Sequence, residues 1–380
     1  MLYRRLSGFF IGCATLAAQC TLPPAPSQGV PDSYFNALAT QNGPGWTGGD
    51  GTYSLALPDG RYLWMWSDSF IGTVDPNTRL RAGWLFTAHN SLTVQDTVTN
   101  TVTTVGYPPK TTSYFVPQTT ANWFWIGDGM VIQPSPGVYK IKIYLLEWTG
   151  VFQFKGNSVA TLSWPALTID SIQKVALPDL TIQWGSRLLR DRNYIYNYGI
   201  KDPGTANKLP YVARMSSVTD LTNPANWQYW STTARAWVSG QANATNLPGV
   251  PGITNEYKVD RMNASTGPFY LMTGMDPRNP PYPGWNAVTT YYACAPWGPW
   301  TTRTVVYTTP ETGAPGCKTG TLLTYNPKAH AEFTSGDQVL LSYNVNTSDG
   351  HDQYCADDYK PRFIRVQIPG LISVAPPPEP

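Results

Sequence analysis

The sequence predicts an all-β protein, a five-bladed β-propeller, on two observations. The first is composition: 33 Gly and 35 Pro accompany 12 Phe, 23 Tyr and 15 Trp in 380 residues. So many aromatic residues exclude a disordered chain, and the turn formers suit many short strands. The second is an internal repeat of about four strands per copy, the size of a propeller blade. One or two β-sandwiches are the alternative fold.

The repeat consists of small or polar residues, a strand, a tight turn and an aromatic-rich strand, and it occurs five times. Its markers are Asp50, Asp128, Ser186, Glu256 and His330. The predicted turns follow them at residues 58–60, 134–137, 191–193, 265–267 and 335–337. The first strand of a blade lines the channel, so we expect the markers to ring one mouth of it. The alternative is that these polar residues tie neighbouring blades together.

The chain divides into four predicted parts. Residues 1–20 resemble a signal peptide, with Arg4 and Arg5 before an apolar stretch over 6–18, and predict secretion. A lipoprotein-type cleavage before Cys20, and so a lipid anchor, is an alternative. Residues 21–32 are expected to form a Pro-rich linker, 33–370 the propeller and 371–380 a Pro-rich tail. Residues 360–368 should be the last strand and pair with the segment near 34–38 to close the ring.

Five cysteines are present, and Cys294, Cys317 and Cys355 lie in the predicted domain. An oxidising compartment permits one disulfide among these three, in any of three pairings, with one thiol left over. We find no Cys/His spacing typical of zinc, and we expect no cofactor and no metal at the site. A structural Ca²⁺ in the channel near His330, held by oxygen ligands, stays open.

The net charge is +2, without a long basic run, which argues against nucleic acid as a partner. No apolar run is long enough to span a membrane. Many aromatic residues and few charges suit a neutral, polar ligand such as a polysaccharide, although an aromatic core explains them as well. We expect a monomer.

The first predicted hairpin places two carboxylates opposite each other. Its turn centres on Asp59, so residues paired across it sum to about 118, and Asp50 faces Asp68. Repulsion between close carboxylates raises one pKa and leaves the other low. Glycoside hydrolysis needs this division, and a separation of about 5–5.5 Å predicts the retaining route. A β-bulge would turn one Asp away.

Other candidates for binding substrate are Asn90, Asp128, Trp125, Trp184, Glu256 and His330. Asn90 follows a strand and could reach a substrate hydroxyl, or form a plain turn. Trp125 and Trp184 could stack on a sugar, or pack in the core. His330 could support substrate or a carboxylate, or be a structural histidine.

The motifs Gly48-Gly49-Asp50-Gly51 and Trp66-Ser67-Asp68-Ser69-Phe70 resemble those of glycoside hydrolase family 183. The resemblance covers most of residues 40–368. It implies a five-bladed propeller that hydrolyses internal α-linkages between D-arabinofuranose units of mycobacterial arabinan with retention. The catalytic pair would be Asp50, as nucleophile, and Asp68, as acid/base. Residues 277–299 have no counterpart in the family, which leaves the substrate open.

Two other functions stay open. An inverting arabinanase or xylosidase-like enzyme would use Asp50 as base, Asp128 as pKa tuner and Glu256 as acid. A carbohydrate-binding propeller without catalysis would have one equivalent aromatic pocket per blade. The acid pair occurs only in the first repeat, which favours an enzyme.

Overall fold

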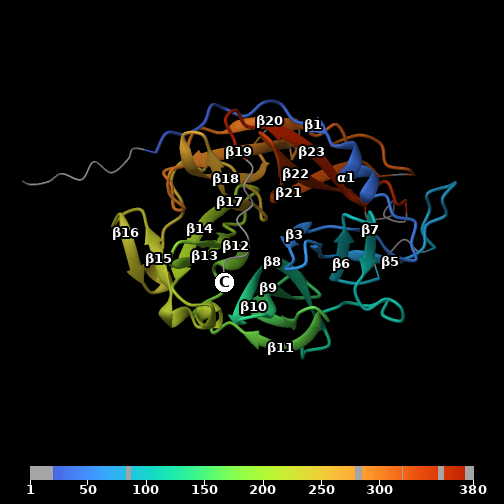
Figure 1. Cartoon of the computed structure of the whole chain (residues 1–380), viewed down its shortest axis with the longest axis horizontal. Helices are drawn as coiled ribbons and strands as arrows, with labels where there is room; N and C mark the ends of the chain where they lie inside the picture. The colour runs from blue at the N-terminus through green and yellow to red at the C-terminus, as the bar shows by residue number, and fades with distance from the viewer. Residues whose placement is uncertain (1–19, 83–86, 279–284, 319, 350–354, 373–380) are drawn as a thin grey trace, which may run out of the picture.

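Five β-sheets stand around a central axis in the computed structural model, which describes residues 20–82, 87–278, 285–318, 320–349 and 355–372 (Figure 1). Each sheet is an antiparallel meander that runs outward from an innermost strand. The innermost strands β3, β8, β12, β17 and β21 contact one another in a closed ring. The prediction of a five-bladed propeller is confirmed.

The first two blades contain four strands each. The strands of blade one are β3 (Tyr53–Ala56), β4 (Tyr62–Trp66), β6 (Ser91–Asp96) and β7 (Thr101–Thr104). Those of blade two are β8 (Asn122–Ser135), β9 (Val138–Thr149), β10 (Phe154–Ser163) and β11 (Thr168–Lys174).

Blade three has a fifth strand, and short 3₁₀ helices lie at Val218–Thr222, Pro224–Asn226 and Gln241–Asn243. Its strands are β12 (Gln183–Asp191), β13 (Tyr194–Lys201), β14 (Leu209–Met215), β15 (Gln228–Ser231) and β16 (Ala236–Ser239). Blade four consists of β17 (Lys258–Ala264), β18 (Gly267–Asp276), β19 (Ala287–Ala293) and β20 (Thr304–Thr308). Blade five consists of β21 (Leu322–Ser335), β22 (Gln338–Thr347), β23 (Pro361–Gln367) and β1 (Val30–Pro31).

Blade one also carries a two-stranded ribbon, in which β2 (Gly45–Gly49) pairs with β5 (Ser69–Gly72). The ribbon continues the β3–β4 hairpin toward the mouth of the channel. The register is the same in both pieces, because Tyr53 pairs with Met65 and Gly49 pairs with Ser69. A register shift falls between Trp46 and Gly48, beyond the two aspartates.

Buried side chains between neighbouring blades form the hydrophobic core. Each of the five interfaces has its own apolar cluster, so the core is a ring of clusters rather than one centre. The interface of blades five and one is aromatic, with Trp64 and Trp66 stacked at 5.7 Å between ring centroids. This packing fixes the radial position of each innermost strand and of the side chains it presents to the channel.

The ring closes through the N-terminal segment. Val30 and Pro31 pair with Arg365 and Ile364 of β23. The expectation that residues 34–38 supply this strand is wrong, because Ser33–Leu38 is helix α1. Asp32 is its N-cap and accepts a hydrogen bond from the Phe35 amide at 2.8 Å.

The segment that precedes β1 is held against the domain rather than free. Leu22 packs on the core of blades four and five, and Gly29 N donates to Val306 O at 2.6 Å. A disulfide joins Cys20 to Cys294, and this segment runs along the outer edge of blades four and five (Figure 1). The predicted Pro-rich linker over 21–32 is thus held along the surface of the domain.

The second disulfide, Cys317–Cys355, is one of the three pairings that the sequence left open. The expectation of a leftover thiol is wrong, because Cys20 pairs with Cys294. A thioether-linked lipid and this disulfide would use the same Sγ atom of Cys20, so the two states exclude each other. Residues 1–19 of the predicted signal peptide and 373–380 of the predicted tail lie outside the described residues. Within the described ranges no helix has the length and apolar character needed to cross a membrane.

Candidate active site

Asp50 and Asp68 face each other across the ribbon of blade one, as the register predicts. Asp50 N donates to Asp68 O at 3.1 Å, and Ser67 N donates to Asp50 O at 2.8 Å. These two bonds place Asp50 beside both Ser67 and Asp68 of the facing strand. The two carboxylates are close enough for the charge of Asp68 to raise the pKa of Asp50.

Glycine lets the chain pass from β2 to β3 directly after Asp50. Gly51 has φ +79°, and a Cβ atom there would lie 3.0 Å from the Ser67 backbone nitrogen. Thr52 follows with φ 47°, an unusual conformation for a residue with a side chain. The motif Gly49-Asp50-Gly51 thus turns the strand while keeping Asp50 in register with Asp68.

Asp68 is bound by two N–H donors from outside its own hairpin. Trp125 on β8 donates from Nε1 to Asp68 Oδ1 at 2.9 Å, and His89 Nδ1 lies 3.0 Å from the same oxygen. Burial raises the pKa of Asp68 above its usual value, and the contacts with His89 and Trp125 offset part of this rise. The side chain keeps 15% exposure, so it can still reach a ligand.

Asp50 is bound by tyrosines from blade five. The Tyr325 hydroxyl donates to Asp50 Oδ2 at 2.8 Å. Tyr359 also hydrogen-bonds to the Asp50 carboxylate and donates to the Asp68 carbonyl oxygen at 3.1 Å. Burial raises the pKa of Asp50 well above its usual value, and Asp68 and Glu256 raise it further, while the two tyrosines lower it.

Glu256 joins the pair from blade four and forms an ion pair with Lys328 of β21. Lys328 is fully buried, and its Nζ lies 4.3 Å from the centroid of the Tyr53 ring. Three carboxylates and one lysine leave an excess of negative charge in a desolvated place. Retaining a proton relieves that excess, and the pKa of Asp50 is raised more strongly than that of Asp68.

A cavity of about 50 Å³ opens beside these groups at the same mouth of the channel. Trp125 and Trp148 line it from blade two, Ser186 from blade three and Glu256 from blade four. Of the predicted site residues, the structure therefore gathers Asp50, Asp68, Trp125 and Glu256 at one mouth. The marker Ser186 lies there too.

Two predicted substrate-binding residues are structural instead. Asn90 is fully buried, and its amide donates to the carbonyls of Phe115 and Phe124 at 2.9 and 2.8 Å. Trp184 is fully buried in the core between blades two and three, with Nε1 bound to Gln241 Oε1 at 2.9 Å. Neither side chain can contact substrate, so both expectations are corrected.

The expectation that Asp128 and His330 bind substrate is also corrected, because both side chains are fully buried. Asp128 has no exposed surface and accepts hydrogen bonds from Arg187 Nη1 at 2.7 Å and from Leu188 N at 2.9 Å, which ties blade two to blade three. His330 is fully buried between hydroxyls, and its Nε2 lies 2.8 Å from Ser342 Oγ. They serve as contacts between strands and blades, the alternative that the sequence left open.

The sequence did not single out Lys328, Tyr325, Tyr359 or His89. The ladder of β21 and β22 shifts register between Tyr325 and Lys328, with Asn326 at φ 53°. Because of this irregularity, the residues of blade five at the channel mouth are Tyr325 and Lys328, which precede the expected marker His330 in the sequence. Tyr359 lies outside the repeat, so no repeat-based signal could find it.

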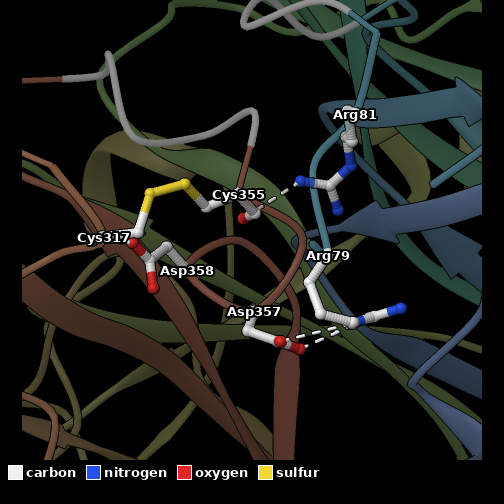
Figure 2. The surroundings of a disulfide bond; sticks show 6 residues. All are labelled: Arg79, Arg81, Cys317, Cys355, Asp357 and Asp358. Carbon is white, nitrogen blue, oxygen red and sulfur yellow. Dashed lines mark hydrogen bonds and ion pairs between the residues drawn. A yellow bond between two sulfur atoms is a disulfide. The ribbon is translucent and has the colours of Figure 1, made fainter. Parts of the chain in front are cut away.

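Figure 2 shows the Cys317–Cys355 disulfide, which anchors the segment that leads to Tyr359. Arg81 donates to the Cys355 carbonyl oxygen at 3.4 Å, and Arg79 forms an ion pair with Asp357 at 3.2 Å (Figure 2). Arg81 also donates to the Tyr359 carbonyl oxygen at 3.1 Å. These contacts join the segment to blade one, which carries the aspartate pair.

One group among the described residues, Cys317, Cys355 and Asp358, brings three potential metal-ligand atoms together. The two sulfur atoms are bonded to each other, which leaves no thiolate for a metal. The group therefore does not fit a metal in this form.

The fold and the site define a five-bladed propeller with an acidic pair at one mouth of its channel. The chain belongs to the family described as Domain of unknown function (DUF5005), whose model matches residues 32–368. A comparison with curated proteins gave no match.

Solved structures resemble the chain in fold. A "putative hydrolase" from Bacteroides ovatus has 21% sequence identity and a TM-score of 0.70, covering 91% of this chain and 93% of its own. A GH43_1 enzyme from Xanthomonas citri has 13% identity and a TM-score of 0.49, covering 92% and 94%. An endo-arabinase from Bacteroides thetaiotaomicron has 11% identity and a TM-score of 0.45, covering 90% and 97%.

Proposed function

We propose that the protein is a secreted glycoside hydrolase that cleaves internal α-D-arabinofuranosidic linkages of microbial cell-wall arabinan with retention. The observation that carries the proposal is the Asp50–Asp68 pair, opposed across one ribbon and held by donors from blades one, two and five. Opposed carboxylates with different environments are what a double-displacement glycosidase needs. The sugar and the linkage come from the resemblance to family 183.

The environments favour Asp68 as nucleophile and Asp50 as acid/base, the reverse of the expectation from sequence. A nucleophile must be ionised, and Trp125 and His89 stabilise the Asp68 anion. A general acid must hold a proton in the free enzyme, and burial, Asp68 and Glu256 all raise the pKa of Asp50.

The proposed reaction has two steps. The Asp68 carboxylate attacks the anomeric carbon, the bond to the leaving sugar breaks, and the leaving oxygen takes the proton of Asp50. Water then attacks the same carbon, gives its proton to Asp50 and releases Asp68 as a carboxylate. Glu256 and Lys328 adjust the charge around Asp50 throughout.

An inverting mechanism with Asp50, Asp128 and Glu256 has less support. Asp128 is enclosed and neutralised by Arg187, and the charges that most raise the pKa of Asp50 are those of Asp68 and Glu256. In that mechanism Asp68 would be dispensable.

The test is a screen of polysaccharides, including mycobacterial arabinogalactan, with products identified by mass and the first anomer by proton NMR. We expect arabino-oligosaccharides with retained configuration. Asp50→Asn and Asp68→Asn should each lower turnover by a factor of at least about 10² with the fold intact. Asp59→Asn, in an exposed turn, is the matched control. Wild-type turnover in both site variants, or an inverted product, would refute the proposal.

A further inference from the structure

An aromatic shelf lies beside the acid pair on the blade-two side. It consists of Trp123 and Trp125 on β8 and Phe152 in the turn between β9 and β10. The ring centroids of Trp123 and Trp125 are 6.1 Å apart, and that of Phe152 lies 5.7 and 5.9 Å from them. The His89 ring stacks on Trp123 at 4.7 Å with an interplanar angle of 15°.

The shelf is not part of the hydrophobic core. Along β8 the residues alternate, and Phe124 and Ile126 enter the core between blades one and two, whereas Trp123 and Trp125 stay half-buried on the other face. Phe152 is 65% exposed, and no other Phe or Trp among the described residues counts as exposed.

Phe152 adopts an unfavourable backbone conformation for its residue type. Its φ is 56°, which costs a residue with a Cβ atom about 1 kcal/mol or more. The turn could relieve this with glycine, yet it presents a phenyl ring to solvent, next to Val151 with 82% exposure. Strain and exposure at one residue point to a role in binding rather than in folding.

The shelf is continuous with the candidate active site. Trp125 belongs to the shelf and donates to Asp68, and His89 stacks on Trp123 and also contacts Asp68. A molecule that lies on the shelf is therefore adjacent to the catalytic pair. The side chains of Trp123, Trp125, Val151 and Phe152 carry no charge. A neutral ring with an apolar face fits this surface better than an ionic ligand does.

We propose that the shelf binds a further sugar unit of a polysaccharide chain, beyond the unit held at Asp50 and Asp68. This inference rests on the proposed function and specifies it: the substrate is a polymer that extends over blade two, with Phe152 as the outer contact. Phe152 then governs the binding of long chains and leaves the chemistry at the aspartate pair unchanged.

The test is electrophoresis in native gels that contain soluble arabinan, arabinogalactan or xylan, compared with gels without polysaccharide. The test variant Phe152→Gly removes the ring and relaxes the turn, so its melting temperature should equal or exceed that of the wild type. Its apparent affinity should fall roughly three- to tenfold. Phe152→Trp should keep the affinity, and so should Val98→Ala, a control in another exposed turn.

A kinetic readout separates this inference from the proposed function. On a cleaved polymer, Phe152→Gly should raise KM with little change in kcat, and on an aryl arabinofuranoside it should match the wild type. Absence of hydrolysis together with Phe152-dependent retardation would refute the catalytic proposal and leave the shelf in place. If no gel retards the wild type, or if Phe152→Gly is retarded equally, the proposal that the shelf binds a sugar unit is wrong.

Discussion

Asp50 and Asp68 belong to different strands, yet the backbone nitrogen of Asp50 donates directly to the carbonyl oxygen of Asp68 at 3.1 Å. This bond holds the two residues next to each other across the ribbon. Their surroundings differ, because Asp68 accepts from two N–H groups and Asp50 from tyrosine hydroxyls. The predictions that follow test this difference.

Trp125→Phe removes one donor from the Asp68 carboxylate while keeping an aromatic ring in place. Because the donor stabilises the anion, its loss should raise the pKa of Asp68. The acidic limb of the pH profile of kcat/KM should move up by about one pH unit. Trp123→Phe, which keeps the shelf and does not contact Asp68, should leave the limb in place. An unmoved limb in Trp125→Phe would contradict the assignment of Asp68 as the ionised partner.

Asp50→Asn should stabilise the fold at neutral pH, although it abolishes activity. The raised pKa of Asp50 means that the folded state binds more protons than the unfolded state, so this group costs stability as pH rises above its unfolded pKa near 4. The variant removes that cost, so its advantage in stability should be largest near neutral pH and vanish toward pH 4. Melting curves across this range measure it. An advantage that grows as pH falls would contradict the raised pKa.

Lys328→Met leaves Glu256 without its buried partner. We expect a loss of roughly 2–4 kcal/mol in the free energy of unfolding and a higher pKa for the proton-holding group of the site. The double variant Lys328→Met with Glu256→Gln should recover part of that stability, because no unpaired charge remains. Denaturant titrations of the four proteins form a double-mutant cycle. Purely additive losses would show that the two residues do not interact.

The fold and the acid pair were predictable because both depend on local patterns. Turn residues set the five hairpins, and the turn at Asp59 set the register that brings Asp50 opposite Asp68. The residues that contact Asp50 and Asp68 could not be predicted in this way. Tyr325, Lys328 and Tyr359 come from blade five and meet blade one only when the ring closes. Asn90 and Trp184 were misassigned because polar and aromatic residues serve the core equally well. Burial, which decides between these roles, is set by the packing of blades.

The Cys317–Cys355 disulfide should affect catalysis as well as stability. It closes a loop of 38 residues, and replacing both cysteines by Ser should cost roughly 3–4 kcal/mol. The same change loosens the segment that holds Tyr359 over the aspartates, so kcat should fall in the folded protein. Replacing Cys20 and Cys294, which join the N-terminal segment to blade four, should leave kcat unchanged. Equal kcat values for both double variants at a temperature well below melting would show that Tyr359 has no role in catalysis.

The central claim, that Asp68 attacks the anomeric carbon, is tested most directly by trapping. A 2-deoxy-2-fluoro-arabinofuranosyl fluoride forms the glycosyl ester faster than water can cleave it, so mass spectrometry of peptides locates the modified residue. We predict a label on Asp68 that is absent in Asp68→Asn. A label on Asp50 would reverse the two roles. The retaining mechanism would be contradicted by an unlabelled enzyme that hydrolyses the reagent to a product of inverted configuration.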